Sequence, residues 1–308
     1  MRVRFGICAD LHSDYIHDSY ERFSKFIDAS VDSKCDFMIF LGDSITPGES
    51  NREDKEKMRS VIASSAIPIY HALGNHDMDE NRKCDVLDYL NMPRSYYSFD
   101  CGGVHFVVLD TCYFLGSDGY ESYEFGNYKK AEMKNISVLP DKVLSWLAED
   151  LASADYPSVI FSHHSLIESR TGIGNTEAVR SVINNAPRGV ILCACGHEHV
   201  DRLDEYLGVY YWCVNSMSYY WAGSKYSHRT YGDDIELSHP NLRNVFPYRD
   251  PLFAIVEIAD DIITIKGRDS DIVGNSPESM DFKKAGLLDP ITASIKNRVL
   301  KIQGRSYK

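Results

Sequence analysis

Carboxylates, one amide and several histidines recur in this sequence directly after short apolar runs. The five places that carry them are Asp10 with His12, Asp43, Asn75 with His76, His163 with His164, and His197 with His199. Carboxylate and imidazole ligands without thiolates suit manganese, iron or zinc, and two such ions about 4 Å apart form a common hydrolytic centre. In an extended loop, alternate residues point to the same side, so the first and last pairs can each direct two ligands into one small volume. The residue types therefore predict a two-metal hydrolytic site.

Each of these places also has a simpler interpretation. Asp10 could end a turn, His12 could be an ordinary surface residue, and Asp43 could cap a helix after its strand. His71 and His105 lie within apolar strands, and we interpret both as hydrogen-bonded core histidines. For one motif alone the simpler interpretation is the better one, but five motifs in order, each after a strand, favour a shared site.

The elements that must position these residues alternate along the chain. Apolar runs predict strands at 3–9, 37–41, 67–73, 104–110, 158–161 and 190–195, and amphipathic patterns predict helices at 19–33, 53–66, 140–154 and 177–185. This rhythm predicts parallel strands with right-handed crossovers, and function usually lies at the carboxyl ends of such strands. Gly102 and Gly103 predict an antiparallel hairpin, so the fold class is α/β with a mixed or second sheet.

The second half of the chain has a less regular pattern. Later strands are predicted at 209–214, 253–258 and 262–266. We expect one domain over 1–266, with a substrate-facing aromatic insertion at 218–250. A C-terminal extension at 267–308 is expected to pack on this domain, and its only pattern, at 295–302, fits a short helix or strand.

The composition excludes several classes of protein. The 308 residues are 44% hydrophobic, which suits a globular protein with a substantial core. A formal net charge of −12, with no stretch rich in lysine or arginine, argues against binding to a nucleic-acid backbone. No apolar run is long enough for a membrane span and no secretory signal pattern is evident, so we expect a cytoplasmic protein whose cysteines are reduced.

The order of the motifs resembles that of the calcineurin-like metallophosphoesterase superfamily. The resemblance spans 10–199 and is carried by Asp10-x-His12, Gly42-Asp43, Gly74-Asn75-His76-Asp77, His163 and Gly196-His197-x-His199. It implies a four-layer α/β/β/α sandwich of two mixed β-sheets flanked by helices, with two divalent cations, Mn, Fe or Zn, at the strand ends. The compact motif set is similar to that of bacterial small-molecule phosphodiesterases and phosphatases.

The resemblance also implies a role for each residue. The first cation would take Asp10, His12 and His199, the second would take Asn75, His163 and His197, and Asp43 would bridge them. A hydroxide between the two ions would attack phosphorus while His76 protonates the leaving group. We favour His163 over His164 as the ligand because it comes first after the strand. Candidate supporting or substrate-contacting residues are Asp77, His164, Arg170, Tyr219, Tyr220 and Trp221, and further candidate phosphate contacts are Lys225, His228 and Arg229.

The implied function is hydrolysis of a small phosphorylated substrate. A phosphodiester, such as a nucleotide or cyclic nucleotide, is the first choice, and a phosphomonoester is the alternative. Thr46 stands where purple acid phosphatases have a tyrosine, which argues against an iron–tyrosinate enzyme. A nuclease is disfavoured by the acidic charge, and a non-catalytic interaction scaffold is disfavoured because every implied ligand is present.

Overall fold

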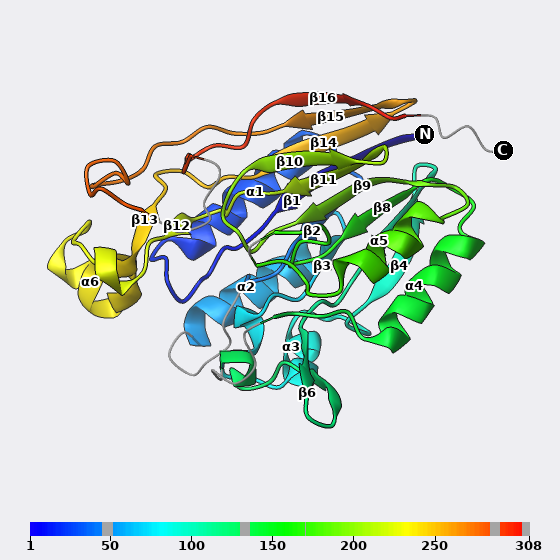
Figure 1. Cartoon of the computed structure of the whole chain (residues 1–308). Coiled ribbons are helices and arrows are strands. Elements are labelled where there is room, and N and C mark those ends of the chain that lie inside the picture. Colours follow the sequence, from blue (N-terminus) through cyan, green and yellow to red (C-terminus); the bar gives the residue numbers. More distant parts are fainter. Residues whose placement is uncertain (45–51, 130–135, 170, 284–289, 304–308) are drawn as a thin grey trace.

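Two six-stranded mixed β-sheets face one another at the centre of the protein (Figure 1). The computed structural model describes residues 1–44, 52–129, 136–169, 171–283 and 290–303. The first sheet has the order β16 (Arg298–Lys301), β15 (Ile262–Lys266), β14 (Ala254–Ala259), β1 (Arg2–Cys8), β2 (Phe37–Phe40) and β3 (Ile69–His71). Within it β1, β2 and β3 are parallel, and the later strands add antiparallel neighbours.

The second sheet repeats this plan with parallel strands at its centre. Its order is β10 (Arg202–Tyr206), β11 (Val209–Cys213), β9 (Val190–Cys195), β8 (Ser158–Phe161), β5 (Val104–Val108) and β4 (Tyr97–Cys101). β4 and β10 are antiparallel to their neighbours and form the two edges. The parallel strands of both sheets can therefore present their carboxyl ends to one side of the molecule.

The core between the sheets explains why the predicted strands read as continuous apolar runs. Phe5 stacks on Phe37 within the first sheet, with ring centroids 5.0 Å apart. Phe106 and Phe161 of the second sheet meet the Phe5 ring edge-on, with ring centroids 5.6 and 5.7 Å away. Because helices cover the outer faces as well, the central strands are buried on both sides and lack the alternation of a half-exposed strand.

Helices form the two outer layers (Figure 1). Their bounds are α1 (Ser19–Asp32), α2 (Arg52–Ser64), α3 (Lys83–Tyr89), α4 (Asp141–Ser153), α5 (Thr176–Asn184) and α6 (Asp233–Ser238). Phe23 and Phe26 of α1 pack with Phe40 on the first sheet. Leu147 of α4 and Val179 of α5 pack on the second sheet. The predicted four-layer α/β/β/α sandwich is confirmed, whereas α3 and α6 were not predicted.

The C-terminal extension and the insertion have distinct structures. In the extension, β16 pairs with β15 and so continues the first sheet. In the insertion, β12 (Tyr219–Trp221) pairs with β13 (Val245–Pro247), and α6 and the short 3₁₀ helices η5 (Ser224–Tyr226) and η6 (Pro240–Asn244) lie between these strands in sequence. Residues 111–129 contain the hairpin β6 (Tyr113–Gly116) and β7 (Gly119–Ser122) and the 3₁₀ helix η3 (Asn127–Lys129), while 130–135 lie outside the described residues.

The two core histidines differ from each other. His105 lies between Asp100 and Asp150, with ring nitrogens 2.7 and 2.9 Å from their carboxylates, as expected of a hydrogen-bonded core residue. His71 is buried as predicted, but neither of its ring nitrogens has a hydrogen-bond partner, so the prediction was wrong about its hydrogen bonds. Burial lowers the pKa of His71 to about 4, which keeps the ring neutral without a partner. The Tyr97 hydroxyl instead bonds the backbone N–H and C=O of His71 and so covers the exposed edge of β3.

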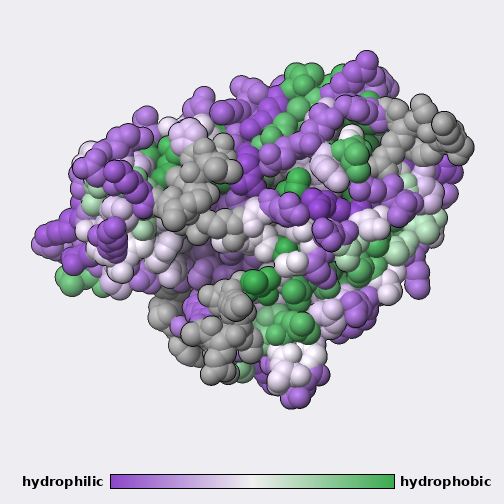
Figure 2. Space-filling model, viewed as in Figure 1, coloured by the Kyte–Doolittle hydropathy of each residue, from purple (hydrophilic) through white to green (hydrophobic). Residues whose placement is uncertain are grey.

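The surface seen in Figure 2 is largely hydrophilic, with apolar residues in separate areas. Large exposed apolar side chains lie far apart in sequence, among them Leu115, Leu207, Leu237 and Val299. Among the helices of the described ranges, none combines the length and the apolar character that a bilayer crossing requires.

Candidate metal centre

All five motifs lie just beyond strand ends, where the two sheets bring them together. Asp10, Asp43 and Asn75 follow β1, β2 and β3 of the first sheet, and His163 and His197 follow β8 and β9 of the second. Backbone hydrogen bonds connect the exits: the Asp10 N–H donates to Gly42 at 3.0 Å, and the Gly196 N–H donates to His163 at 3.0 Å. The site is therefore built from both sheets rather than from one loop.

Five of these residues adopt a left-handed backbone conformation. The φ angles are 54° at Asp10, 49° at His12, 51° at Asp43, 69° at His197 and 54° at His199. This region costs a residue with a Cβ roughly 1–2 kcal/mol, and such residues gather at functional sites that the surrounding structure holds in place. The pairs Asp10 with His12 and His197 with His199 thus aim their side chains through left-handed turns, not through the extended loops that the spacing suggested.

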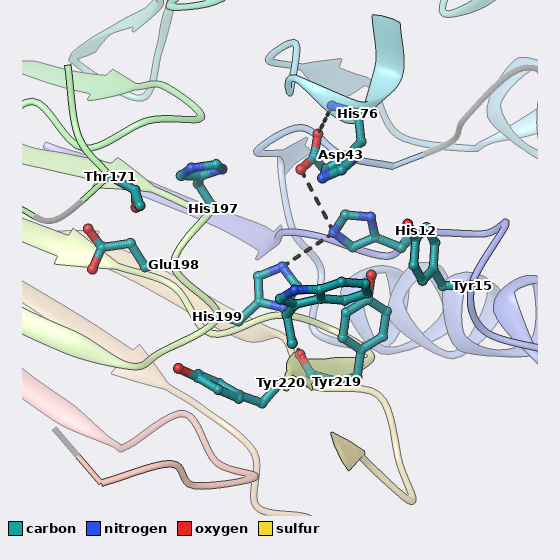
Figure 3. Close-up of a pocket in the computed structure, with 11 residues that line it drawn as sticks. His12, Tyr15, Asp43, His76, Thr171, His197, Glu198, His199, Tyr219 and Tyr220 are labelled. Atoms are coloured by element: carbon teal, nitrogen blue, oxygen red, sulfur yellow. Dashed lines mark hydrogen bonds and ion pairs between the residues drawn. The ribbon is translucent and has the colours of Figure 1, made fainter. Parts of the chain in front are cut away.

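The first group of convergent side chains contains Asp10, His12 and His199. Their ligand atoms lie within 4.8 Å of one another, and the Nε2 atoms of the two histidines are 3.3 Å apart. The Nδ1 of His199 lies 2.8 Å from the carbonyl oxygen of Tyr219 and must donate to it, because a carbonyl only accepts. This bond makes the Nε2 of neutral His199 a bare acceptor that faces the His12 imidazole (Figure 3) and also the Asp10 carboxylate. A cation satisfies such a set of acceptors.

The second group centres on the Nε2 of His163. It lies 3.1 Å from Asp43 Oδ2, 3.1 Å from Asn75 Oδ1 and 3.2 Å from His197 Nδ1. Its Nδ1 donates to the Leu41 carbonyl oxygen at 2.8 Å, which fixes the ring orientation. Burial alone would lower the pKa of His163, but the negative charge of Asp43 outweighs it and raises the pKa to about 10. The environment thus strongly favours positive charge at this point.

Asp43 lies between the two groups. Its Oδ2 is 3.1 Å from His163 Nε2 and 3.8 Å from His12 Nε2. Burial raises the pKa of Asp43, yet the neighbouring histidines, His163 first and then His76, hold it well below the ordinary value. Asp10 can also contribute to both groups, because its carboxylate could share a cation with His12 and His199 or with Asp43 and His163. Oxygen and nitrogen donors in this number and spacing fit two divalent cations.

His164 lies at the rim of the second group. Its ring centroid is 4.4 Å from that of His197, and with His163 these residues form a third set that can hold a metal. Its Nδ1 lies 2.9 Å from the hydroxyl oxygen of Thr111. Burial, followed by the charge of His163, lowers the pKa of His164 well below its ordinary value.

His76 is in contact with the centre but belongs to none of the metal-holding groups. Its backbone N–H donates to Asp43 Oδ1 at 2.7 Å, and its Nδ1 donates to Asp79 Oδ2 at 2.7 Å. Burial would lower the pKa of His76, but Asp43 and then Asp79 raise it to about 9. Asp79 was missed by the sequence reasoning, although a carboxylate three residues after a histidine at the start of a helical turn is the signal for such a pair.

Asp77 supports the loops instead of facing the site. Its carboxylate accepts hydrogen bonds from the backbone N–H groups of Gly74 at 2.8 Å, Asp43 at 3.2 Å and Ser44 at 3.1 Å. Gly74 lies so close to Asp43 that a Cβ would collide with the Asp43 side chain and backbone. The glycine and Asp77 together set the distance between the exits of β2 and β3.

A cavity of about 290 Å³ opens onto the centre (Figure 3). Besides the histidines and Asp43, its lining contains Tyr15, Thr171, Glu198, Tyr219, Tyr220 and Trp221. Tyr219 and Tyr220 are 1% exposed and add little open surface to this lining, whereas Trp221 is 37% exposed. Tyr15 meets Trp221 edge-on, with ring centroids 5.6 Å apart. These two rings form an aromatic corner of the cavity, and Tyr15 was not singled out from the sequence.

Other predicted phosphate contacts lie elsewhere. Lys225, His228 and Arg229 are not among the residues that line the cavity. Arg229 is paired with Asp233, and His228 packs on Phe246. Arg170 and Thr46 lie outside the described residues.

Comparison with known proteins agrees with this geometry. The family model for calcineurin-like phosphoesterases matches residues 3–201, whereas no curated protein matches the chain. Similar solved structures include a dimetal phosphatase from Danio rerio, with a TM-score of 0.62, 19% identity, and coverage of 86% of this chain and 96% of that one. GAP50, the anchor in the inner membrane complex of Plasmodium, has a TM-score of 0.56 and 16% identity, covering 99% and 90%. Purple acid phosphatase PPD1 from yellow lupin has a TM-score of 0.56 and 13% identity, covering 96% and 53%. At these identities the structural likeness shows the fold alone.

Proposed function

Since this chain belongs to the calcineurin-like phosphoesterase family and is therefore a metal-dependent hydrolase of phosphoric esters, we propose that it cleaves a small phosphodiester with a planar leaving group. The proposal rests on one observation: nitrogen and oxygen acceptor atoms that follow strands of both sheets converge in two adjacent groups. In each group, imidazole nitrogens and carboxylate oxygens face one another at 3.1–3.4 Å.

The two groups define the cation sites. Asp10, His12 and His199 would hold one cation, Asn75, His163 and His197 would hold the other, and Asp43 would contact both. When bound, such a pair of cations activates water and neutralises charge on the phosphoryl oxygens. The protein contributes fixed ligand orientation through the Leu41 and Tyr219 carbonyl oxygens, which hold His163 and His199.

His76 would hold the proton that the leaving oxygen receives. Its ring lines the cavity, and its Nδ1 donates to Asp79, so a proton delivered to a substrate would come from Nε2. Against the effect of burial, the carboxylates of Asp43 and Asp79 raise the pKa of His76, a direction that favours the protonated ring that a general acid requires. Its centroid lies 5.2 Å from that of His12, which places the acid beside the first cation site.

The charge of the cavity favours a diester over a monoester. Near neutral pH a phosphodiester carries one negative charge, and a monoester carries closer to two. Among the described residues that line the cavity there is no lysine or arginine, and Glu198 adds a carboxylate, paired with Arg202 at 2.8 Å. Apart from the cations and a protonated His76, the described part of the lining therefore offers little compensation for a second negative charge.

The aromatic corner favours a planar leaving group such as a nucleoside. Tyr15 lies 6.5 Å from His76 between ring centroids, so a group leaving toward His76 would meet the Tyr15 and Trp221 rings. Offset or edge-to-face contacts with aromatic rings contribute about 0.5–1.5 kcal/mol each. Cyclic nucleotides combine such a ring with a phosphodiester.

The test is a matched panel of substrates on metal-stripped protein reloaded with Mn²⁺, Fe²⁺ or Zn²⁺. The panel contains nitrophenyl phosphate, bis-nitrophenyl phosphate and several cyclic nucleotides. We expect kcat/KM for the diesters to exceed that of the monoester by about 10-fold or more, and no turnover before metal is added. A higher kcat/KM for the monoester than for the diesters would favour the phosphomonoesterase alternative. No turnover of any member with two cations bound would contradict the proposal and favour a scaffold.

A further inference from the structure

The hydroxyl of Tyr128 lies between the second cation site and the partner of His76. It accepts a hydrogen bond from Asn75 Nδ2 at 3.1 Å and donates one to Asp79 Oδ1 at 2.5 Å. The other oxygen of Asp79 accepts from His76 Nδ1 at 2.7 Å and pairs with Lys129 at 2.8 Å. Tyr128 and Asp79 are largely buried, with Tyr128 8% exposed. One chain of hydrogen bonds therefore joins a proposed metal ligand to the proposed acid.

The directions of these bonds are determined by chemistry. The carboxylate of Asp79 can only accept, so the phenolic proton of Tyr128 is committed to it. The Tyr128 oxygen can then only accept from Asn75, which must present its NH₂ group. An asparagine amide can turn over and exchange its oxygen and nitrogen, but here the turned form would set oxygen against oxygen. Asn75 Oδ1 is thereby directed to the opposite side, 3.1 Å from His163 Nε2.

We infer that Tyr128 is a positioning residue that fixes the Asn75 amide with its oxygen toward the second cation, and that Asp79 orients both Tyr128 and His76. This inference rests on the proposed function, because it takes Asn75 as a ligand of the second cation. The inference adds Tyr128 and Asp79 to the site, and neither residue is part of the family motifs. It also explains why Asp79 is held by three donors, from His76, Tyr128 and Lys129.

A packing role for Tyr128 makes a different prediction. Its ring stacks on Tyr123, with centroids 4.7 Å apart, and this contact is independent of the hydroxyl. Tyr128→Phe keeps the ring and removes only the hydroxyl. A residue needed solely for packing would leave metal binding unchanged in this variant.

The experiment titrates the metal-stripped full chain with Mn²⁺ and measures the affinity of each equivalent by calorimetry. We expect Tyr128→Phe to weaken the second equivalent by about 10- to 100-fold, the usual effect of losing a group that orients a metal ligand, and to leave the first equivalent unchanged. Tyr120→Phe is the matched control, because its hydroxyl bonds Asp141 on the surface, and both equivalents should bind as in the unaltered chain.

Two variants of Asp79 extend the test. Asp79→Leu removes the acceptor that holds the Tyr128 proton, so it should weaken the second equivalent as Tyr128→Phe does. Asp79→Asn keeps a carbonyl acceptor for Tyr128 and should restore most of the affinity. Thermal unfolding without metal, measured for each variant, separates a loss of fold from a loss of orientation. If Tyr128→Phe does not fold, the comparison of the two Asp79 variants decides.

The outcomes separate this inference from the proposed function. If Tyr128→Phe binds both equivalents of Mn²⁺ as tightly as the unaltered chain does, the positioning role is overturned and the two-metal centre stands. Equal affinities in Asp79→Leu and Asp79→Asn would overturn the role of Asp79. Fewer than two equivalents in the unaltered chain would overturn both the inference and the centre on which it rests.

Discussion

Replacement of His76 by glutamine should reveal whether this residue supplies a proton to the leaving group. The side chain lines the cavity without belonging to a metal-holding group, so the change removes the acid and spares the ligands. The pKa of His76 is raised to about 9, by Asp43 and then Asp79 against the opposing effect of burial. The hydrogen bond from Nδ1 to Asp79 favours the protonated ring, so the variant loses the contribution of the acid.

The expected magnitude follows from what each leaving group requires. General acid catalysis contributes about 10²- to 10⁴-fold, or about 3–5 kcal/mol of barrier. A diester with an alkoxide leaving group needs that proton, so kcat/KM for its hydrolysis should fall by this factor. Nitrophenolate is stable without protonation, so bis-nitrophenyl phosphate should lose about 10-fold or less.

The assay compares both substrates on the same preparation of His76→Gln, with metal content measured in parallel. Two cations should be retained, because the proposed ligands are all present. Equal losses on the two substrates would refute the assignment of His76 as the acid, and a loss of metal would instead show that the substitution disturbed the neighbouring Asn75.

Three further changes test separate parts of the structure. Asp43→Ala should reduce binding of both cations, since its carboxylate faces both groups, and two full equivalents found by metal analysis would contradict a bridging role. Trp221→Ala should raise KM for cyclic nucleotides about 2- to 10-fold, equivalent to an aromatic contact of about 0.5–1.5 kcal/mol, while KM for dimethyl phosphate stays unchanged. Burial opposes the charged form of His105, but hydrogen bonds to Asp150 and Asp100 raise its pKa above the unfolded value of about 6.5. Its ion pairs therefore stabilise the fold fully below that pH, and this contribution is lost as pH rises through the folded pKa. The difference in unfolding free energy between the unaltered chain and His105→Gln, from urea denaturation, should accordingly shrink with rising pH, and a constant difference would exclude the linkage.

The sequence predicted the central strands closely because their burial leaves a clear pattern. The ranges 158–161 and 190–195 were predicted with the bounds that the structure has, since both faces of β8 and β9 are covered and the apolar runs end where the polar exits begin. The preference for His163 over His164 rested on position in the chain. The structure adds a physical reason, because the Nε2 of His163 faces Asp43 and Asn75.

Features that depend on tertiary contacts had no local signal. Tyr128 lies in a short 3₁₀ helix and Asp79 directly after another, and their pairing joins residues distant in sequence. Tyr15 becomes part of the cavity because tertiary contacts place its ring against those of His12, His76 and Trp221. The apolar surroundings of His71 suggested a core residue, but the absence of a hydrogen-bond partner for its ring can be seen only in the folded chain.

The central claim is that two cations held by residues from both sheets are required for phosphodiester hydrolysis. Its most direct test adds Mn²⁺ stepwise to metal-stripped protein while bound metal and hydrolysis of bis-nitrophenyl phosphate are measured in the same samples. We predict no turnover without metal and a rate that rises as the second equivalent binds. Full turnover in the metal-stripped protein, or two bound equivalents without turnover, would contradict the claim.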